Sequence, residues 1–263
     1  MSYLGYTSVI SSFCSMIKNP RILEIGVDKG QTAIPLLHNM CLQSQGGDYF
    51  KYVGIDVRHD ITLQEQIGAM KKIVLFTESD DFENGTMTLT EDALWNTAYL
   101  INNSLNVLPM LEGLKFDVIM IDGDHNYATV SKELKYIEKL CFDSTIIVVD
   151  DYNGRWSDKD LHYKERDSHN DIDSLEKLPD VLDKRGVKAA VDDWLEASGE
   201  WKMLSDNVNE PVFLMKTHVD LGIKTNSKFL KDSGIYYQAS KSLERFVPEV
   251  SQMLTEGKSV SVN

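Results

Sequence analysis

The amino-acid sequence predicts an α/β fold in which helices wrap a mostly parallel sheet. Short runs of apolar, β-branched residues alternate along the chain with amphipathic stretches, a pattern typical of strand–helix–strand units. The apolar runs are unbroken, as expected of strands that are buried on both faces. A chain of 263 residues with 42% hydrophobic residues is large enough to bury such a sheet.

Five strands are predicted from these runs, and two more from a hairpin near the end of the domain. The five runs cover residues 21–25, 52–56, 73–76, 116–121 and 145–149. Within residues 201–217, two strand-like runs flank the turn-forming segment 206–211, which predicts an antiparallel hairpin at one edge of the sheet. Pro211 would begin the second strand of this hairpin, where its missing N–H is tolerated.

Helices are predicted between the strands from apolar residues that recur three and four positions apart. Three such stripes are formed by Leu94, Ala98, Ile101 and Leu105, by Val130, Leu134, Ile137 and Cys141, and by Val187, Ala190, Val191, Trp194 and Leu195. We assign these residues to the core and expect no functional role for them.

The sequence predicts three parts in the chain. Residues 1–19 are expected to form an N-terminal helix, residues 20–217 the sheet domain, and residues 218–263 a C-terminal helical extension with a helix at 236–254. Residues 152–185 are polar and charged and show little periodicity. So long a segment between a strand and a helix is typical of a disordered stretch or of a functional lid, and we expect a lid-like insertion.

Charge and composition argue against several classes of protein. The net charge of −14 repels phosphate backbones, and the chain has no dense Lys/Arg run, so neither nucleic acid nor a membrane is an expected partner. Cys14, Cys41 and Cys141 lie far apart and form no CxxC pair, which indicates buried small side chains in a reducing compartment. The sequence shows no signal-peptide pattern and no apolar run near the roughly 20 residues of a membrane span. We therefore expect a cytoplasmic protein.

The segment RILEIGVDKGQTAIPLL has the features of a nucleotide-type binding turn. A buried strand carries Glu24 and ends before Gly26, and Gly30 opens a helix with Thr32. Glycines let the backbone approach a ligand closely, and a helix N-terminus offers free N–H groups. Asp28 stands where the dinucleotide fingerprint G-x-G-x-x-G has its middle glycine, so a nicotinamide dehydrogenase is the weakest alternative. A βα turn without any ligand has the same glycines.

The second and third predicted strands also end in polar residues. Asp56 lies at the carboxyl end of the second strand, where an acid usually binds two ribose hydroxyls, although a helix-capping acid is an alternative. The third strand runs into Glu78 and Ser79. These two side chains are either partners of an adenine edge or simple turn formers.

The fourth and fifth predicted strands end in a cluster of acids. Asp122, Asp124 and His125 follow one strand, and Asp150 and Asp151 follow the other. Neighbouring strands are about 4.8 Å apart, and two like charges about 4 Å apart repel by roughly 4 kcal/mol at an effective dielectric constant near 20. Either some acids are protonated, or a hard cation such as Mg²⁺, Mn²⁺ or Ca²⁺ lies among them. Individual aspartates that cap helices, and a histidine that only bonds the backbone, are the alternatives.

The order of five segments, EIGVDKG, GID, IDGDHNYATVSKEL, VVDDY and GVKAAVDDW, resembles class I S-adenosylmethionine-dependent methyltransferases. Within them it resembles the branch of the macrocin O-methyltransferase and cephalosporin-hydroxylase-like proteins. The resemblance covers about residues 20–217, and the IDGDH-x-Y and DDY pair is its specific part. It implies a Rossmann-like, seven-stranded, mostly parallel sheet with helices on both faces and an antiparallel last strand.

The resemblance also implies roles for individual residues. The cofactor-binding candidates are Glu24, Gly26, Gly30, Thr32, Asp56, Glu78, Ser79 and Asp122. The implied metal ligands are Asp122, Asp150 and Asp151. The catalytic candidates are Asp124, as general base, and His125. Two departures are Asp28, which replaces a common glycine, and the length of residues 152–185, which exceeds the usual link.

The function expected from the sequence is metal-assisted O-methylation of a sugar, polyol or phenol hydroxyl. The expected cofactors are S-adenosylmethionine and a divalent cation, with Mg²⁺ preferred over Mn²⁺ or Ca²⁺. The alternatives are a metal-independent N-methyltransferase and a protein that binds S-adenosylmethionine or a nucleotide without catalysis. The expected partners are a small-molecule substrate and a second copy of the chain, which would associate through the terminal helices.

Overall fold

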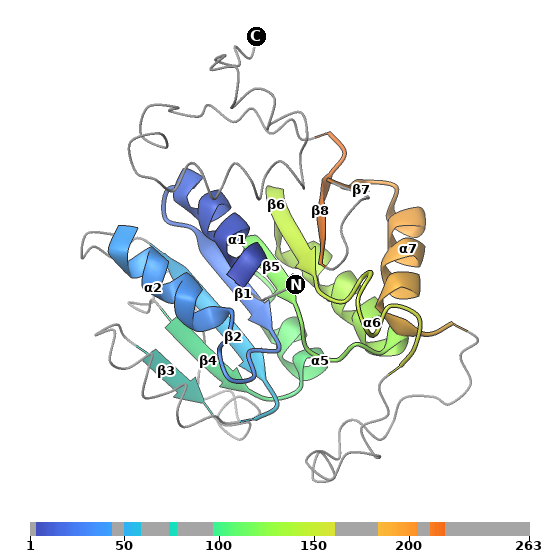
Figure 1. Cartoon of the computed structure of the whole chain (residues 1–263), viewed down its shortest axis with the longest axis horizontal. Helices are drawn as coiled ribbons and strands as arrows, with labels where there is room; N and C mark the ends of the chain where they lie inside the picture. The colour runs from blue at the N-terminus through green and yellow to red at the C-terminus, as the bar shows by residue number, and fades with distance from the viewer. Residues whose placement is uncertain are drawn as a thin grey trace.

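The computed structural model describes residues 4–43, 50–58, 74–77, 97–160, 184–204 and 211–218. They form a sheet with helices on both faces (Figure 1). One face is covered by α1 (Leu4–Met16) and α2 (Ala33–Gln43). The other is covered by α5 (Ser104–Val107), η1 (Leu108–Leu111), α6 (Tyr127–Ile137), η2 (Glu138–Leu140) and α7 (Gly186–Ser198).

The described sheet has eight strands in the order β3-β4-β2-β1-β5-β6-β8-β7. Their bounds are Arg21–Ile25 (β1), Lys51–Asp56 (β2), Val74–Thr77 (β3), Thr97–Ile101 (β4), Phe116–Ile121 (β5), Cys141–Val149 (β6), Trp201–Met203 (β7) and Val212–Lys216 (β8). β8 runs antiparallel to β6 and to β7, and the other pairs are parallel. The Rossmann-like fold and the terminal hairpin are therefore confirmed. The strand beyond the expected seven is β4, which lies between β2 and the expected strand β3.

Strand burial explains why the apolar runs are unbroken. In β5, Ile119 and Ile121 pack with the α6 and α7 side, whereas Val118 and Met120 pack with the α1 and α2 side. Successive side chains of a strand point to opposite faces, so a strand with helices on both sides needs an apolar residue at every position. Full burial of one such side chain contributes about 1.5–3 kcal/mol to stability.

The helix expected from Leu94, Ala98, Ile101 and Leu105 is wrong. Residues 97–101 form β4, and the only helix that follows before η1 within residues 97–160 is the four-residue α5. Ala98 and Leu100 pack on one face of the sheet and Tyr99 on the other, which is the alternation of a strand. Thr97, Tyr99 and Ile101 are also residue types that favour strands.

The other two apolar stripes are confirmed. Val130, Leu134 and Ile137 are buried on α6, and Val187, Ala190, Val191 and Trp194 are buried on α7. Cys141, however, is the first residue of β6 and is not part of a helix.

Backbone hydrogen bonds bring the carboxyl ends of five strands into one row. Each joins the N–H of the residue after one strand to a carbonyl at the end of its neighbour, over 2.8 or 2.9 Å: Asn102 to Asp56, Gly26 to Ile55, Asp122 to Ile25, and Asp150 to Ile121. The residues that follow β4, β2, β1, β5 and β6 are thus side by side at one edge of the sheet. This edge is where ligands bind in open α/β folds.

Several predictions fall outside the described residues. They concern Glu78 and Ser79, residues 161–183 of the expected insertion, and the expected helix at 236–254. The domain boundaries at residues 19 and 217 stay predictions.

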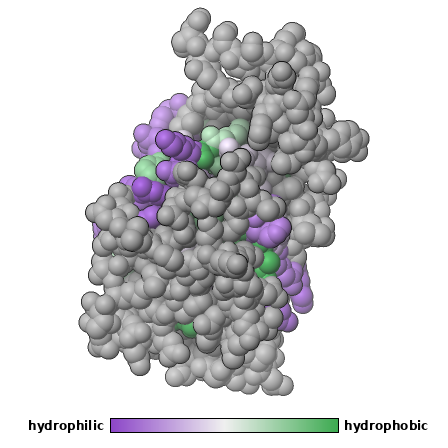
Figure 2. All heavy atoms as spheres, turned by 90° about the vertical axis from the view of Figure 1, so that its left-hand side faces the viewer, coloured by the Kyte–Doolittle hydropathy of each residue, from purple (hydrophilic) through white to green (hydrophobic). Residues whose placement is uncertain are grey.

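The described surface offers little continuous apolar area on the face seen in Figure 2, where the coloured hydrophobic residues are small and scattered among hydrophilic ones. Met16, Val57 and Met110 are its large exposed hydrophobic side chains, at 44%, 37% and 46% exposure. Among the described helices, none has the length and apolar character to cross a membrane.

Candidate functional site

The turn after β1 requires a residue without a side chain at Gly26. Its φ is +85°, and an added Cβ would lie 2.1 Å from the backbone oxygen of Asp122. The chain leaving β1 therefore passes directly against the chain leaving β5. Asp28 also has a left-handed backbone, with φ of +44°, at the position where the dinucleotide fingerprint has glycine. Aspartate tolerates this conformation better than most residues, but at a cost.

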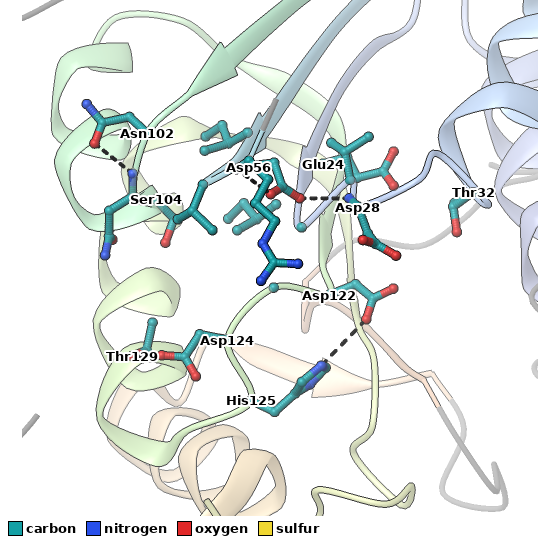
Figure 3. Close-up of a pocket in the computed structure, with 18 of the residues that line it drawn as sticks. Glu24, Asp28, Thr32, Asp56, Asn102, Ser104, Asp122, Asp124, His125 and Thr129 are labelled. Carbon is teal, nitrogen blue, oxygen red and sulfur yellow. Dashed lines mark hydrogen bonds and ion pairs between the residues drawn. The ribbon is translucent and has the colours of Figure 1, made fainter. Parts of the chain in front are cut away.

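Asp56 joins this turn to the end of β2 (Figure 3). One carboxylate oxygen accepts a hydrogen bond from Asp28 N over 2.7 Å, and the other accepts one from Arg58 N over 2.9 Å. Burial raises the pKa of Asp56, while the backbone N–H groups that it binds lower it. The backbone of Val27 also hydrogen-bonds to Asp56. An ionised carboxylate has about four acceptor positions, so Asp56 keeps acceptor capacity for a ligand in addition to these three bonds.

Glu24 is a buried acid beneath the turn, with 2% of its surface exposed. Tyr52 donates a hydrogen bond from its hydroxyl to Glu24 Oε2 over 2.6 Å. Burial raises the pKa of Glu24 to about 8, with the Tyr52 bond lowering it and the charge of Asp56 raising it. Glu24 is therefore mostly protonated at neutral pH.

Asp122 lies at the centre of the acid cluster. Burial, and then the neighbouring carboxylate of Asp150 through its charge and a hydrogen bond, raise the pKa of Asp122 well above its usual range. His125 lies between two acids, because its Nε2 is 3.9 Å from Asp122 Oδ1 and its Nδ1 is 3.6 Å from Asp151 Oδ2. The nearer of these two acids is Asp151, whose carboxylate would stabilise a proton on the imidazole of His125.

Asp124 is oriented by the first turn of α6. Its Oδ1 accepts a hydrogen bond from Asn126 N over 3.1 Å, and its Oδ2 accepts one from the hydroxyl of Thr129 over 2.5 Å. Figure 3 shows Asp124 and Thr129 together on one side of the pocket, with His125 lying between Asp124 and Asp122. Asp124 is thus held in one orientation at the pocket wall.

These elements surround a pocket of about 360 Å³, within the range of small-molecule sites. Its charged lining residues are Glu24, Asp28, Asp56, Asp122, Asp124, Arg58 and His125. Gly26, Thr32 and Trp156 also line it. The excess of carboxylates favours a ligand with positive charge and disfavours a pyrophosphate.

Not all of the candidate residues line this pocket. Gly30, with φ of +74°, shapes the turn but is not among the lining residues. Asp150 lines a neighbouring cavity of about 10 Å³ together with Glu24, Thr32 and Asp122. Asp151 contacts the pocket through the side chain of His125, which lines it.

Residues 102–104 line the pocket, and the sequence interpretation missed them. They follow β4, which pairs with β2, and so occupy the place expected for Glu78 and Ser79. Asn102 Oδ1 accepts a hydrogen bond from Asn103 N over 2.7 Å, and Asn103 caps α5 by accepting one from Leu105 N over 2.9 Å. Polar residues directly after a strand-forming run, Thr97–Ile101, were the signal that pointed to them.

The implied metal ligands do not converge into a ready metal site. Among the described residues, no group of three or more His, Cys, Asp or Glu side chains has an arrangement that could hold an ion. Asp122 is hydrogen-bonded to Asp150, and Asp151 faces His125. Carboxylates are the donors that Mg²⁺ prefers, but this arrangement does not fit a bound ion, and we derive no step through a metal.

Comparison with known proteins indicates which class of domain the chain contains. Residues 23–152, about half of the chain, match the family model described as a methyltransferase domain. The solved structure of CalS11, described as a TDP-rhamnose 3′-O-methyltransferase of calicheamicin biosynthesis, has 13% identity and a TM-score of 0.51 over 81% of this chain and 78% of that chain. No curated protein sequence matches the chain significantly.

Two further structures have similar coverage. TomG from Streptomyces achromogenes, an O-methyltransferase solved with S-adenosylmethionine, has 16% identity and a TM-score of 0.45 over 81% of this chain and 79% of that chain. An O-methyltransferase from Bacillus cereus, solved with S-adenosylhomocysteine, has 16% identity and a TM-score of 0.45 over 80% and 77%.

The fold and the matched domain define an α/β methyltransferase. The match over residues 23–152 and the fold shared with CalS11 agree with the resemblance to class I S-adenosylmethionine-dependent methyltransferases. The expected enzyme class, a methyltransferase, is confirmed at this level, and the expected cofactor S-adenosylmethionine is part of the proposed function.

Proposed function

We propose that the protein transfers the methyl group of S-adenosylmethionine to a hydroxyl oxygen of a small molecule. The observation that carries this proposal is that two adjoining parts of one pocket suit the two reactants, the cofactor and the acceptor. A cofactor end lined by Glu24, Gly26 and Asp56 adjoins the candidate bases Asp124 and His125. A sulfonium cation suits the acidic lining, and a base beside it suits a hydroxyl acceptor.

The proposed position of the cofactor follows the row of strand ends. The methionine end would lie over the turn at Gly26 and Glu24, and the ribose hydroxyls would bind the remaining acceptor positions of Asp56. Residues 102–104 then lie at the adenine end, because β4 is the strand next to β2. Thr32, near the start of α2, lies at the opposite end of the pocket in Figure 3.

The proposed transfer is an in-line displacement. The acceptor oxygen forms a bond to the methyl carbon while the carbon–sulfur bond breaks, which leaves S-adenosylhomocysteine and a methyl ether. The hydroxyl proton passes to Asp124 or to His125. The carboxylate of Asp151, 3.6 Å from Nδ1 of His125, would stabilise the imidazolium if His125 accepts the proton. Holding the two reacting atoms in line accounts for much of the rate increase.

Trp156 supports an acceptor that contains a ring. It is half-buried and lines the pocket together with His125. The guanidinium of Arg155 lies 4.7 Å and the ammonium of Lys159 5.4 Å from the centre of the Trp156 ring, and such cation–π contacts hold an aromatic side chain in place. An aromatic wall favours the apolar faces of sugars and phenols.

Dependence on a divalent cation stays a prediction. Its support is the close approach of Asp122 and Asp150, whose mutual repulsion contributes to the raised pKa of Asp122, since a cation between two carboxylates would relieve such a repulsion. Isothermal titration of the protein with Mg²⁺, Mn²⁺ and Ca²⁺, with and without S-adenosylhomocysteine, tests it. Absence of binding under all of these conditions, and a methylation rate unaffected by chelator, would leave Asp124 or His125 as the sole activator of the acceptor.

The proposed function is tested in two stages. First, S-adenosylhomocysteine should bind the protein in a calorimeter, and Asp56→Ala should lose this binding while keeping a cooperative thermal transition. Second, a panel of sugars, polyols, phenols and amines is assayed for methyl transfer. Transfer to amines alone would replace O-methylation by N-methylation, and binding without any transfer would favour a non-catalytic protein.

A further inference from the structure

Glu133 is a buried carboxyl that the proposed transfer does not use. It lies on α6 and is 0% exposed. Its position, three residues after Val130 and four before Ile137, lies within the apolar stripe of this helix. A carboxyl in a core position is costly unless a hydrogen bond compensates for its lost hydration.

The compensating partner belongs to the wall of the pocket. Glu133 Oε1 lies 2.5 Å from the hydroxyl oxygen of Ser104, and the two side chains are hydrogen-bonded. Ser104 is the first residue of α5 and lines the pocket at the end of β4. Glu133 is therefore the link between α6 and the part of the pocket where we place the adenine.

The other carboxyl oxygen of Glu133 restricts where the proton resides. Within the described part of the chain, Oε2 has no hydrogen-bond partner. Burial raises the pKa of Glu133 to about 8. The hydrogen bond with Ser104 lowers this pKa, whereas the negative charge of Asp124, in the loop after β5, raises it. A neutral carboxyl has one O–H donor, and leaving that donor buried without an acceptor is unfavourable.

The favourable arrangement has the proton on Oε1. The carboxyl of Glu133 then donates to the Ser104 oxygen, and the hydroxyl hydrogen of Ser104 is free to donate into the pocket. When Glu133 is ionised, Ser104 must donate to the carboxylate instead, and it presents only lone pairs to a ligand. The protonation of Glu133 thus decides whether Ser104 acts as a donor or as an acceptor.

We propose that Glu133 is a positioning residue that fixes the hydroxyl of Ser104 as a hydrogen-bond donor toward the adenine end of the cofactor. This inference rests on the proposed function, because it assumes that the adenine lies beside residues 102–104. The same helix face also carries Thr129, one turn earlier, whose hydroxyl holds Asp124. A single face of α6 would then orient both a candidate base and the group that binds the adenine.

Calorimetric titration with S-adenosylhomocysteine and with adenosine tests the proposal. Glu133→Leu keeps the side-chain volume but removes the donor. It should weaken the binding of both ligands about tenfold, as the loss of one hydrogen bond predicts. Glu133→Gln keeps an N–H donor for Ser104 and should bind within about threefold of the wild type. Lys135→Ala, on the exposed side of α6, is the matched control and should not change either affinity.

A pH series separates positioning from a merely structural role. Adenosine is the probe for this series, because Glu24, whose pKa is also about 8, lies at the proposed methionine end. The affinity of the wild type for adenosine should fall between pH 7 and pH 9 as Glu133 loses its proton, and Glu133→Gln should remove this fall. If Glu133→Leu does not fold in a thermal-melt control, two other variants test the proposal. They are Glu133→Gln, through its pH profile of affinity, and Ser104→Ala, which should show the same loss of about tenfold in affinity for both ligands.

The outcomes distinguish this inference from the proposed function. A wild type that does not bind S-adenosylhomocysteine refutes the function itself. If the wild type binds, two results refute only the role of Glu133. One is a folded Glu133→Leu variant with unchanged affinity, and the other is a Glu133→Gln variant that binds as weakly as Glu133→Leu.

Discussion

The hydroxyl of Tyr127 donates a 2.7 Å hydrogen bond to Asp193, and so joins the first residue of α6 to the middle of α7. Tyr152, directly after the paired aspartates at the end of β6, does the same to the neighbouring Asp192 over 2.6 Å. Lys184 donates a hydrogen bond to Asp193, and Lys188 donates one to the hydroxyl of Tyr152, each over 2.7 Å. The segments IDGDHNY, VVDDY and VDDW, far apart in the chain, are therefore connected in space. Helix α7 thus braces the loop after β5, which carries Asp124 and His125, and the loop after β6, which carries Asp150 and Asp151.

The Tyr127→Phe and Tyr152→Phe variants should each unfold more easily. Each loses one hydrogen bond to a charged carboxylate and should reduce the free energy of unfolding by about 1–2 kcal/mol, which urea denaturation measures. Tyr136→Phe, also on α6 and half-buried, is the control with an equal loss of one hydroxyl. Equal stabilities for Tyr127→Phe and Tyr136→Phe would mean that the bond to Asp193 does not brace the loop.

The stability of the protein should decrease as pH rises from 5 to 9. Burial raises the pKa of Glu24 to about 8, above the value near 4.3 of an unfolded chain. The folded state therefore binds more protons than the unfolded state between these values, and the contribution is complete below the lower pKa and is lost through the upper one. Glu133 has the same raised value and adds to the effect.

Glu24→Gln isolates the share of Glu24 in this pH dependence. A glutamine stays neutral, so the variant should lose less stability than the wild type over the same range, with a difference on the order of a few kcal/mol at pH 9. Urea denaturation at several pH values measures it. A parallel decline in both proteins would show that Glu24 ionises in the folded state as easily as in the unfolded state.

Much of the site was predictable because its residues follow buried strands. The runs before Gly26, Asp56, Asp122 and Asp150 are long, apolar and β-branched, and a parallel sheet aligns their carboxyl ends. Residues 102–104 were missed because the run Thr97–Ile101, although as long as β1, was assigned to a helix. Its spacing of Ala98 and Ile101 also fits a helix, and periodicity alone does not separate these alternatives.

Side-chain partners were less accessible to sequence reasoning. The position of Glu133 within an apolar stripe marks it as unusual, but its bond to Ser104 depends on how α6 packs beside α5. The convergence expected of Asp122, Asp150 and Asp151 illustrates the same limit. Their order along the chain places them near one another, whereas the hydrogen bond between the first two and the contact of the third with His125 arise from tertiary packing.

Substitutions in the glycine turn should have opposite effects. Gly26→Ala would bring a methyl group within 2.1 Å of the backbone of Asp122, so it should separate β1 from β5 and abolish binding of S-adenosylhomocysteine. Asp28→Gly removes the strain of a left-handed φ of +44° and should raise the free energy of unfolding by up to about 1 kcal/mol. Calorimetry and urea denaturation measure the two effects. Normal ligand binding by Gly26→Ala would contradict the close approach.

Asp124→Asn and His125→Gln should identify the base among the two candidates. Both side chains line the pocket, but Asp124 is fixed by Thr129 and Asn126, whereas His125 is held between Asp122 and Asp151. Loss of the general base should lower kcat by roughly 100- to 10,000-fold, while the affinity for S-adenosylhomocysteine stays within about threefold, because neither residue is proposed to hold the cofactor.

Once the substrate panel supplies an acceptor, single-turnover methyl transfer measures the rate for each variant. A rate that falls only in Asp124→Asn assigns proton removal to the carboxylate, and one that falls only in His125→Gln assigns it to the imidazole. Full activity in both would exclude proton removal by either side chain and would favour activation of the hydroxyl by another group at the ends of β5 and β6.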